Sequence, residues 1–149
     1  RGRERDEQAS VMLRFVKFRV YCGVHDQRGL FVYVRVFATK GEMLRALNVE
    51  AKAWGLPRYN RKTQGAMQGY KSSTTPACIG SVNLYVRGLT HETVTHEFGH
   101  ATFAYRERLG KLDAWRVEEV FCYALGRMVN RFVQRVAKLG FMVTDRELA

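Results

Sequence analysis

THETVTHEFGHA, residues 90–101, has the pattern of a helix that begins at a capping residue. Thr90 precedes the first turn, and threonine is preferred as an N-cap because its hydroxyl accepts a hydrogen bond from a free backbone amide. The helical pattern continues to about Leu109, and Gly110 is the kind of residue at which helices end. We therefore expect one regular helix from Thr90 to Leu109.

Within this helix, His96, Glu97 and His100 form the pattern H-E-x-x-H. Histidines four positions apart lie one turn apart on the same helical face, so both imidazoles can bind one ion. In this pattern the histidines bind zinc and the glutamate acts as general base. Two surface histidines spaced by chance are the alternative, but Gly99 costs a helix about 1 kcal/mol against alanine, and a close helix–helix approach beneath the site would explain it.

Strand patterns dominate the chain before this helix. Residues 11–21 and 30–38 alternate apolar and polar side chains, which is the period of a half-buried strand, and the polar residues between them indicate a hairpin loop. Residues 77–87 have strand composition again, whereas 58–75 are rich in Gly, Ser, Thr and basic residues and predict a loop or an irregular hairpin arm. Residues 1–10 are charged and are expected to be a disordered arm.

Two further helices are predicted. Thr39 and Glu42 form a capping box that opens the first of them. Asp113 is expected to cap the last helix, whose apolar residues recur at helical spacing up to Val136. Residues 11–149 are enough for one domain. The order of elements predicts the α+β class, with a small antiparallel or mixed sheet and helices against one face.

The composition points to a basic protein outside the membrane. Lys and Arg outnumber Asp and Glu by 25 to 14, which gives a formal charge of +11. Such a surface attracts nucleic acid or acidic partners, although it can also serve solubility alone. Four arginines on one face of the last helix, with the basic loop 58–62, form a candidate phosphate-binding surface: Arg116, Arg127, Arg131 and Arg135.

The compartment is expected to be the cytoplasm. No apolar run approaches the roughly 18 residues of a membrane span, and no signal peptide is visible in the sequence. Cys22, Cys78 and Cys122 are an odd number of cysteines spread far apart, which indicates a reducing environment and small core residues rather than a disulfide framework.

A catalytic zinc needs three protein ligands and an open position for water. Glu118 and Glu119 are candidates for the third ligand, because a helix packed antiparallel to the first would bring its own first turns opposite His100. An oxyanion would also need a hydrogen-bond donor. Three tyrosines are candidates for this role, and Tyr105 is taken as the first choice before Tyr123 and Tyr85.

HEFGHA, followed by a glutamate on the next helix, resembles the zincin metallopeptidases and in particular the gluzincin branch. In that branch a spacer separates H-E-x-x-H from a ligand glutamate, which is often followed three positions later by a small residue. Glu119 lies beyond an 18-residue spacer from His100 and has Cys122 at that position, whereas Glu118 has Phe121. The resemblance therefore implies Glu119 as the third ligand.

The resemblance covers about residues 79–126. The segment EEVFCYALG, residues 118–126, is also similar to the second helix of small intracellular and phage-encoded zincins, which include regulatory peptidases that cleave repressors. The chain lacks the further histidine and Met-turn of the metzincins. In zincins the strand before the motif helix is an edge strand that holds the substrate backbone. The resemblance implies that residues 79–87 form this edge strand.

The sequence thus predicts a zinc-dependent metallopeptidase with Zn²⁺ as cofactor and a specific protein as substrate. The alternative is a zincin-fold binding module for a protein or nucleic-acid partner, with little or no peptidase activity. A third possibility is a protein that only binds nucleic acid, whose function would survive loss of His96 and fail on charge reversal at Arg127 and Arg131.

Overall fold

The computed structural model describes residues 15–23, 29–70, 77–111 and 114–148. The elements follow the predicted order, and a further strand lies within the segment 58–75, for which the sequence predicts a loop or an irregular hairpin arm. The strands are β1 (Phe15–Tyr21), β2 (Phe31–Phe37), β3 (Ala66–Gly69) and β4 (Cys78–Tyr85); the helices are α2 (Lys40–Ala53), α3 (His91–Leu109) and α4 (Ala114–Lys138), with a 3-10 turn η1 (Val86–Gly88) before α3. The predicted arm at 1–10, residues 11–14 of the first predicted strand, most of the hairpin loop, including His25, and the cap Asp113 lie outside the described residues.

The described strands form one mixed sheet in the order β1-β2-β4-β3. β1 pairs with β2 in antiparallel orientation, and β3 pairs with β4 in the same way. β2 and β4 are parallel: after α2 the chain returns to the sheet as β3, which runs opposite to β2, and it then reverses into β4. The α+β class with a mixed sheet is confirmed, and the segment predicted as a loop or hairpin arm contains the edge strand β3.

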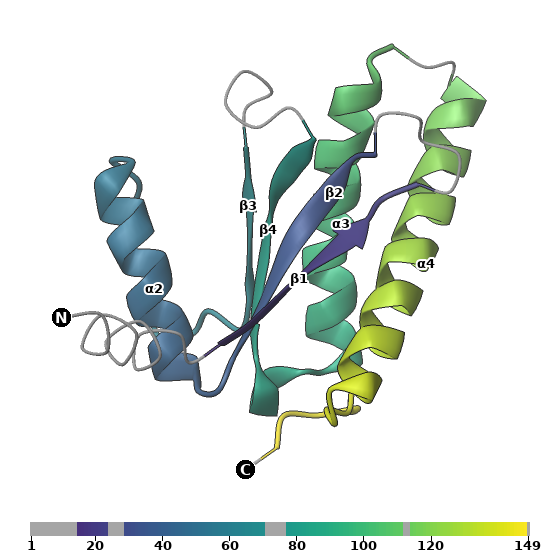
Figure 1. Ribbon diagram of the computed structural model, residues 1–149. Coiled ribbons are helices and arrows are strands. Elements are labelled where there is room, and N and C mark those ends of the chain that lie inside the picture. The colour runs from purple at the N-terminus through teal and green to yellow at the C-terminus, as the bar shows by residue number, and fades with distance from the viewer. Residues whose placement is uncertain (1–14, 24–28, 71–76, 112–113, 149) are drawn as a thin grey trace, which may run out of the picture.

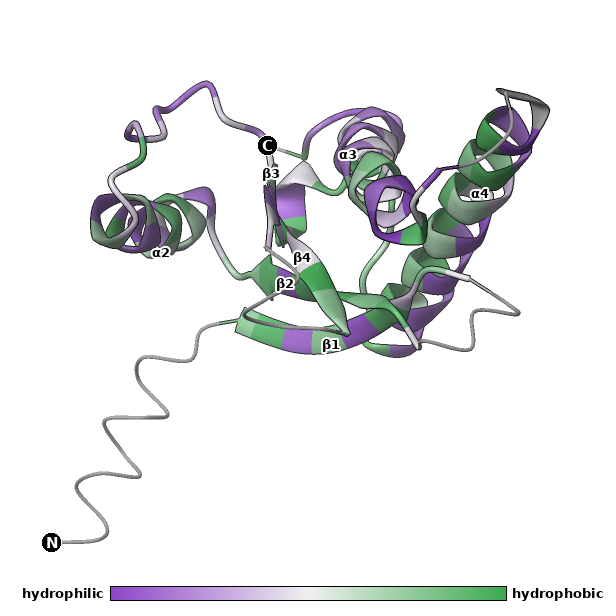
Figure 2. Ribbon diagram, turned by 90° about the horizontal axis from the view of Figure 1, so that it is seen from above, coloured by the Kyte–Doolittle hydropathy of each residue, from purple (hydrophilic) through white to green (hydrophobic). Residues whose placement is uncertain are grey.

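Helices cover both faces of the sheet (Figure 1). The valines of β2 pack with Phe98 of α3 and Phe132 of α4 in the larger core. On the opposite face, Phe37 packs with Met43 and Leu47 of α2. Figure 2 shows the strands lying between α2 on one side and α3 and α4 on the other. The prediction of helices against one face is wrong for α2, because the residues that alternate with the valines of β2 are largely aromatic and also form a core.

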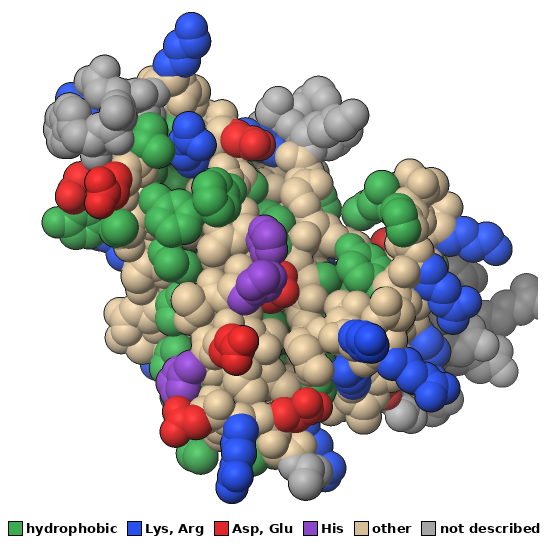
Figure 3. Space-filling model, turned by 180° about the vertical axis from the view of Figure 1, so that it is seen from behind, with side chains coloured by type: hydrophobic (Ala, Val, Ile, Leu, Met, Phe, Trp, Pro, Cys, Tyr) green, Lys and Arg blue, Asp and Glu red, His purple; other side chains and the backbone are tan. Residues whose placement is uncertain are grey.

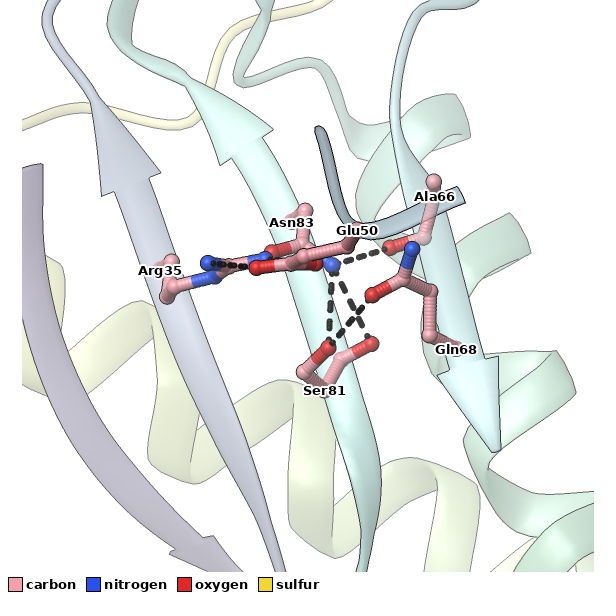
Figure 4. Close-up of polar contacts among 6 residues, drawn as sticks. All are labelled: Arg35, Glu50, Ala66, Gln68, Ser81 and Asn83. Carbon is pink, nitrogen blue, oxygen red and sulfur yellow. Dashed lines mark hydrogen bonds and ion pairs between the residues drawn. The ribbon is translucent and has the colours of Figure 1, made fainter. Parts of the chain in front are cut away.

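A network of polar side chains lies between α2 and the sheet (Figure 4). Arg35 of β2 donates through both Nη atoms to Glu50 of α2, at 2.6 and 2.9 Å, and through Nε to Asn83 Oδ1 of β4 at 2.6 Å. Asn83 Nδ2 in turn donates to Ser81 Oγ at 3.1 Å, and Ser81 Oγ donates to Gln68 Oε1 of β3 at 3.4 Å. The network therefore joins one helix and three strands through buried and part-buried hydrogen bonds.

The C-terminal segment pairs with the start of α3. Thr144 forms an isolated parallel bridge with Thr90, in which the Thr144 amide donates to the Leu89 carbonyl and the His91 amide donates to the Thr144 carbonyl, each at 2.9 Å. The sequence of residues 140–149 is compatible with an added strand or with a frayed end. The segment adds only this short pairing, which holds the first residues of α3 in place.

The described helices contain no segment long and apolar enough to cross a membrane. The cysteines are free thiols. Cys22 and Cys78 are buried, as expected for small core residues, but Cys122 is exposed on α4.

Candidate functional site

The motif helix α3 forms where the sequence predicts it. The hydroxyl of Thr90 accepts a hydrogen bond from the Thr93 amide at 3.1 Å, and the helix ends before Gly110, whose φ of 80° favours glycine. Val94, Phe98 and other apolar residues of α3 are buried against the sheet. The opposite stripe of the helix, which carries the histidine pair, therefore faces outward.

His96 and His100 are close enough to share one ion. Their Nε2 atoms are 3.2 Å apart, and both side chains are exposed. Two nitrogen ligands at the zinc–nitrogen distance of a tetrahedral site would be separated by about 3.3 Å. The geometry of the pair thus fits two adjacent ligands of a tetrahedral ion, as the spacing predicts.

Glu97 is buried beside the pair, with only 6% of its surface exposed. Its Oε1 lies 4.0 Å from His96 Nε2. Burial raises the pKa of the Glu97 carboxyl above its ordinary value, while His96 and a hydrogen bond from the Met67 backbone amide act in the opposite direction. This carboxylate faces the neighbouring edge strand rather than open solvent.

Gly65 makes room for Glu97. A Cβ atom at residue 65 would lie 3.1 Å from Glu97 Cγ and 3.0 Å from a methyl group of Leu84. Neither Gly65 nor the Met67 amide is marked by any sequence motif, because both approach Glu97 from about thirty positions earlier in the chain. Gly99, in contrast, has no atom within 4 Å of an added Cβ, so the expected close helix approach beneath the motif is wrong.

A cleft of about 720 Å³ opens along the outward stripe of α3. One wall is α3, with Glu92, His96, Glu97, His100, Phe103 and Glu107; the other is the segment 59–67, with Tyr59, Gln64 and Met67. Figure 3 shows histidine side chains lying together on this face of the molecule, with acidic side chains beside them. The cleft therefore brings imidazole and carboxylate groups together next to the sheet edge.

The edge strand of this cleft is β3. The resemblance to zincins implies that residues 79–87 are the edge strand, but β4 (Cys78–Tyr85) lies between β2 and β3, and all its residues are buried. That expectation is wrong. A short strand within the segment 58–75 takes the edge position, where it borders the cleft through Ala66 and Met67.

Glu119 and Tyr105 do not lie in this cleft. Both line a separate cavity of about 220 Å³, together with Tyr123, Cys22 and Arg127. Tyr85, the remaining tyrosine candidate, faces α2 and bonds through its hydroxyl to Gln64 and Glu147, each at 2.6 Å. The tyrosine that lines the cleft is Tyr59, which the sequence did not single out.

The register of α3 and α4 explains the position of Glu119. Phe103 contacts Phe121 with ring centroids 4.9 Å apart, and Phe98 contacts Phe132 at 5.3 Å. His100 is therefore level with the middle of α4, and the first turns of α4 lie beside the C-terminal part of α3. The expected placement of Glu118 and Glu119 opposite His100 is wrong, and within the described chain no group of three His, Cys, Asp or Glu side chains is arranged to hold a metal ion.

Comparison with protein-family models, with curated proteins and with solved structures found no match to this chain.

Proposed function

We propose that this protein is a zinc-dependent metallopeptidase that hydrolyses a peptide bond in a specific protein substrate. One observation carries the proposal: the Nε2 atoms of His96 and His100 are 3.2 Å apart in an open cleft that also contains the buried carboxylate of Glu97. A metal-binding pair beside a desolvated carboxylate is the arrangement that metal-assisted hydrolysis requires. The resemblance of HEFGHA to the zincins agrees with it.

The two histidines and Glu97 would have different roles in the hydrolysis. Zinc held by the two imidazoles would polarise the substrate carbonyl and make a bound water more acidic. Glu97 would accept a proton from the attacking water and donate it to the leaving amine. Burial supports this role, since the raised pKa makes the carboxylate a stronger base, and the Met67 amide orients it.

Tyr59 replaces Tyr105 as the candidate donor to the oxyanion. It lines the cleft, and its backbone is held to α2 by Asn48, whose side chain accepts from the Tyr59 amide at 2.7 Å and donates to the Tyr59 carbonyl at 3.2 Å. Tyr105 lines the other cavity and not this cleft.

The substrate would bind as an extended strand along β3. An exposed sheet edge offers backbone amides and carbonyls to a peptide, which then extends the sheet. β3 is the edge nearest to the histidine pair, and the short wall from Gln64 to Met67 borders the cleft. Such pairing favours a flexible segment of a folded protein as substrate, because a peptide that extends a sheet must itself be extended.

The third zinc ligand of the proposed site can be identified by substitution of the candidate glutamates. The resemblance implies Glu119, which would have to leave its cavity on α4; Glu92, one turn before His96, is the alternative on the cleft wall itself. Zinc content and zinc affinity of Glu119→Gln should be compared with those of Glu118→Gln and Glu92→Gln. A loss of about tenfold or more confined to Glu119→Gln would support the ligand that the resemblance implies; a loss confined to Glu92→Gln would place the ligand on α3.

New protein N-termini, identified by mass spectrometry in cells that express the wild type or Glu97→Gln, test the activity itself. Cleavage that occurs only with the wild type would establish a peptidase and identify its substrate. The opposite outcome is the same set of N-termini in cells that express the wild type and in cells that express Glu97→Gln, with one zinc bound per chain in both proteins. That result would argue against hydrolysis and for the alternative of a zincin-fold binding module. Among the residues that the structure describes, no group of three His, Cys, Asp or Glu side chains is arranged to hold a metal ion, and this observation favours the alternative.

A further inference from the structure

The sheet face opposite α3 and α4 is open over β1 and the adjoining part of β2. Val16, Phe18 and Val20 of β1 point toward the larger core, so the residues between them point to the other side. On that side α2 packs near Phe37 and Tyr85, toward one end of the strands. No helix of the described chain lies in front of β1 (Figure 1).

Aromatic rings form a continuous row on this open face. Tyr21 of β1 is paired with Phe31 of β2, with ring centroids 5.7 Å apart, and Phe31 contacts Tyr33 at 5.2 Å. Tyr21 is 46% exposed and Tyr33 is half-buried, whereas Phe31 is 6% exposed. The two tyrosines therefore present ring surface outside the core.

Two cations lie directly over these rings. The Arg19 guanidinium is 4.4 Å from the Phe31 ring centroid, and Lys17 Nζ is 4.0 Å from that of Tyr33. Both side chains are exposed. An arginine guanidinium over a ring can offer its outer side to another planar group, so Arg19 extends the row of stacking surfaces.

The charge of this face is of one sign. β1 and β2 contain no acidic residue, and Lys17 is directly opposite Arg35 in the strand pairing. Like charges opposite one another destabilise a sheet. Glu50 compensates Arg35, but within the described chain no carboxylate forms an ion pair with Lys17 or Arg19.

The positive charge continues around the outer edge of β1. Arg131 of α4 donates to the backbone carbonyls of Tyr21 and Gly23, and Arg135 lies 5.6 Å from the Phe18 ring centroid. An anionic chain that crosses the open face would therefore meet cations on both sides of the β1 edge. This surface is called the β1–β2 face below and is defined by Lys17, Arg19, Tyr21 and Tyr33.

We propose that the β1–β2 face binds single-stranded nucleic acid. Unpaired bases would stack on Tyr21, Tyr33 and the Arg19 guanidinium, while Lys17 and Arg19 contact phosphates. Stacking requires bases that are not enclosed in a duplex, so single strands are favoured over double-stranded DNA. The face lies across the sheet from α3, so this proposal is independent of the hydrolytic one.

Fluorescence anisotropy of a labelled oligonucleotide of about 20 deoxythymidines tests the proposal with the full chain. We expect Lys17→Gln/Arg19→Gln to weaken binding by about tenfold and to lower the slope of log K against log salt by about 1.4, the value for two lost phosphate contacts on a single strand. The matched control is Arg45→Gln/Lys52→Gln, which removes the same charge from exposed positions of α2 and should bind within about twofold of wild type.

A second pair of variants separates stacking from charge. Tyr21→Thr and Tyr33→Thr keep strand propensity but remove the rings, and each should weaken binding by about fivefold or more without a change in salt slope. Circular dichroism and melting confirm that each variant is folded. The proposal would be overturned if the α2 control weakened binding equally or if the tyrosine variants had no effect. It would also be overturned by equal affinity for a duplex of the same sequence, or by displacement with a polyglutamate peptide as readily as with unlabelled oligonucleotide.

Discussion

At the scale of single residues, two glycines near Glu97 have opposite surroundings. Gly65 touches Glu97 and Leu84, whereas Gly99, two positions after Glu97 in the sequence, has open space where a side chain would begin. Glycine loses more conformational entropy on folding than any other residue, so a close neighbour that excludes a side chain is one reason for its presence. Gly65 has such a reason and Gly99 does not.

Gly65→Ala should therefore destabilise the protein and displace the Glu97 side chain. The new methyl group would lie 3.0 to 3.2 Å from Leu84, Glu97 and the Asn83 carbonyl, and the last of these is backbone that cannot easily move. We expect a loss of about 1–3 kcal/mol in the free energy of unfolding, measured by urea denaturation. An unchanged urea midpoint would show that the segment at Gly65 is free to adjust.

Gly99→Ala makes the same chemical change inside α3 and should have the opposite sign. With no atom within 4 Å of the new Cβ, the gain in helix propensity is not offset by a clash. The free energy of unfolding should rise by about 0.5–1 kcal/mol. Destabilisation in the same urea assay would mean that a neighbour approaches Gly99 after all.

Glu97→Gln should change how stability depends on pH in protein stripped of metal with EDTA. Burial raises the pKa of the folded carboxyl above its unfolded value of about 4.3, so the folded state binds the proton more tightly. Wild-type stability from this group is then full below about pH 4.3 and is lost as pH rises through the folded pKa. The variant cannot ionise at this position and should be the more stable protein at neutral pH.

Urea midpoints of both proteins at about pH 4 and pH 7 measure this effect, with the two converging at the lower pH. Glu107→Gln, the same change at an exposed position of α3, is the control and should show little pH-dependent difference from wild type. A wild type that gains stability relative to Glu97→Gln as pH rises would contradict the direction of the pKa shift.

At the scale of elements, α3 depends on two interactions at its N-terminal end. The Thr90 hydroxyl caps its first turn, and the C-terminal segment around Thr144 pairs with the backbone on either side of Thr90. These contacts set where the helix begins, and the helical period then determines that His96 and His100 share one face. The site therefore depends on a cap that is almost two turns away.

Thr90→Ala should lower the free energy of unfolding by about 1 kcal/mol, because the Thr93 amide loses its hydrogen-bond acceptor. Thr95→Ala is the matched control within the same helix. Thr95 is exposed and past the first turn, where alanine has the higher helix propensity, so this variant should be neutral or slightly stabilising. Thermal or urea unfolding of the two variants decides between a cap effect and a general effect of threonine.

At the scale of the whole molecule, Arg35 and Glu50 hold α2 on the sheet face that α3 and α4 leave open. The pair is bidentate, and its side chains are only 13% and 29% exposed, so neither charge is well solvated if its partner is removed. The pair also restrains Asn83, which bonds to the backbone of β3. Removal of one partner should therefore weaken the contacts among α2, β2 and β4.

Glu50→Leu and Arg35→Met should each cost about 1.5–3 kcal/mol of unfolding free energy, the range for hydrogen bonds to charged groups. The double variant should cost less unfolding free energy than the sum of the two single variants. Each single variant leaves one charge without its partner, whereas the double variant removes both charges. A double-mutant cycle in urea measures this coupling. Strict additivity would mean that α2 is held by its apolar residues alone.

Local patterns predicted the helices and strands because each depends on residues only a few positions apart. The capping residues Thr39 and Thr90 and the helical spacing of His96 and His100 lead directly to α2 and α3. The alternation of residues in β1 and β2 likewise predicts strands with two different faces. The candidate metal-binding pair belongs to this group, since one turn of helix is enough to define it.

Tertiary packing decided which residues meet that pair. Gly65 and Met67 reach Glu97 because β3 takes the sheet edge, and Glu119 lies away from His100 because aromatic contacts set the register of α4 on α3. Neither outcome follows from periodicity. Spacing along the chain determines the face on which a side chain lies, but the element that packs against that face is determined by complementary shape between residues far apart in the sequence.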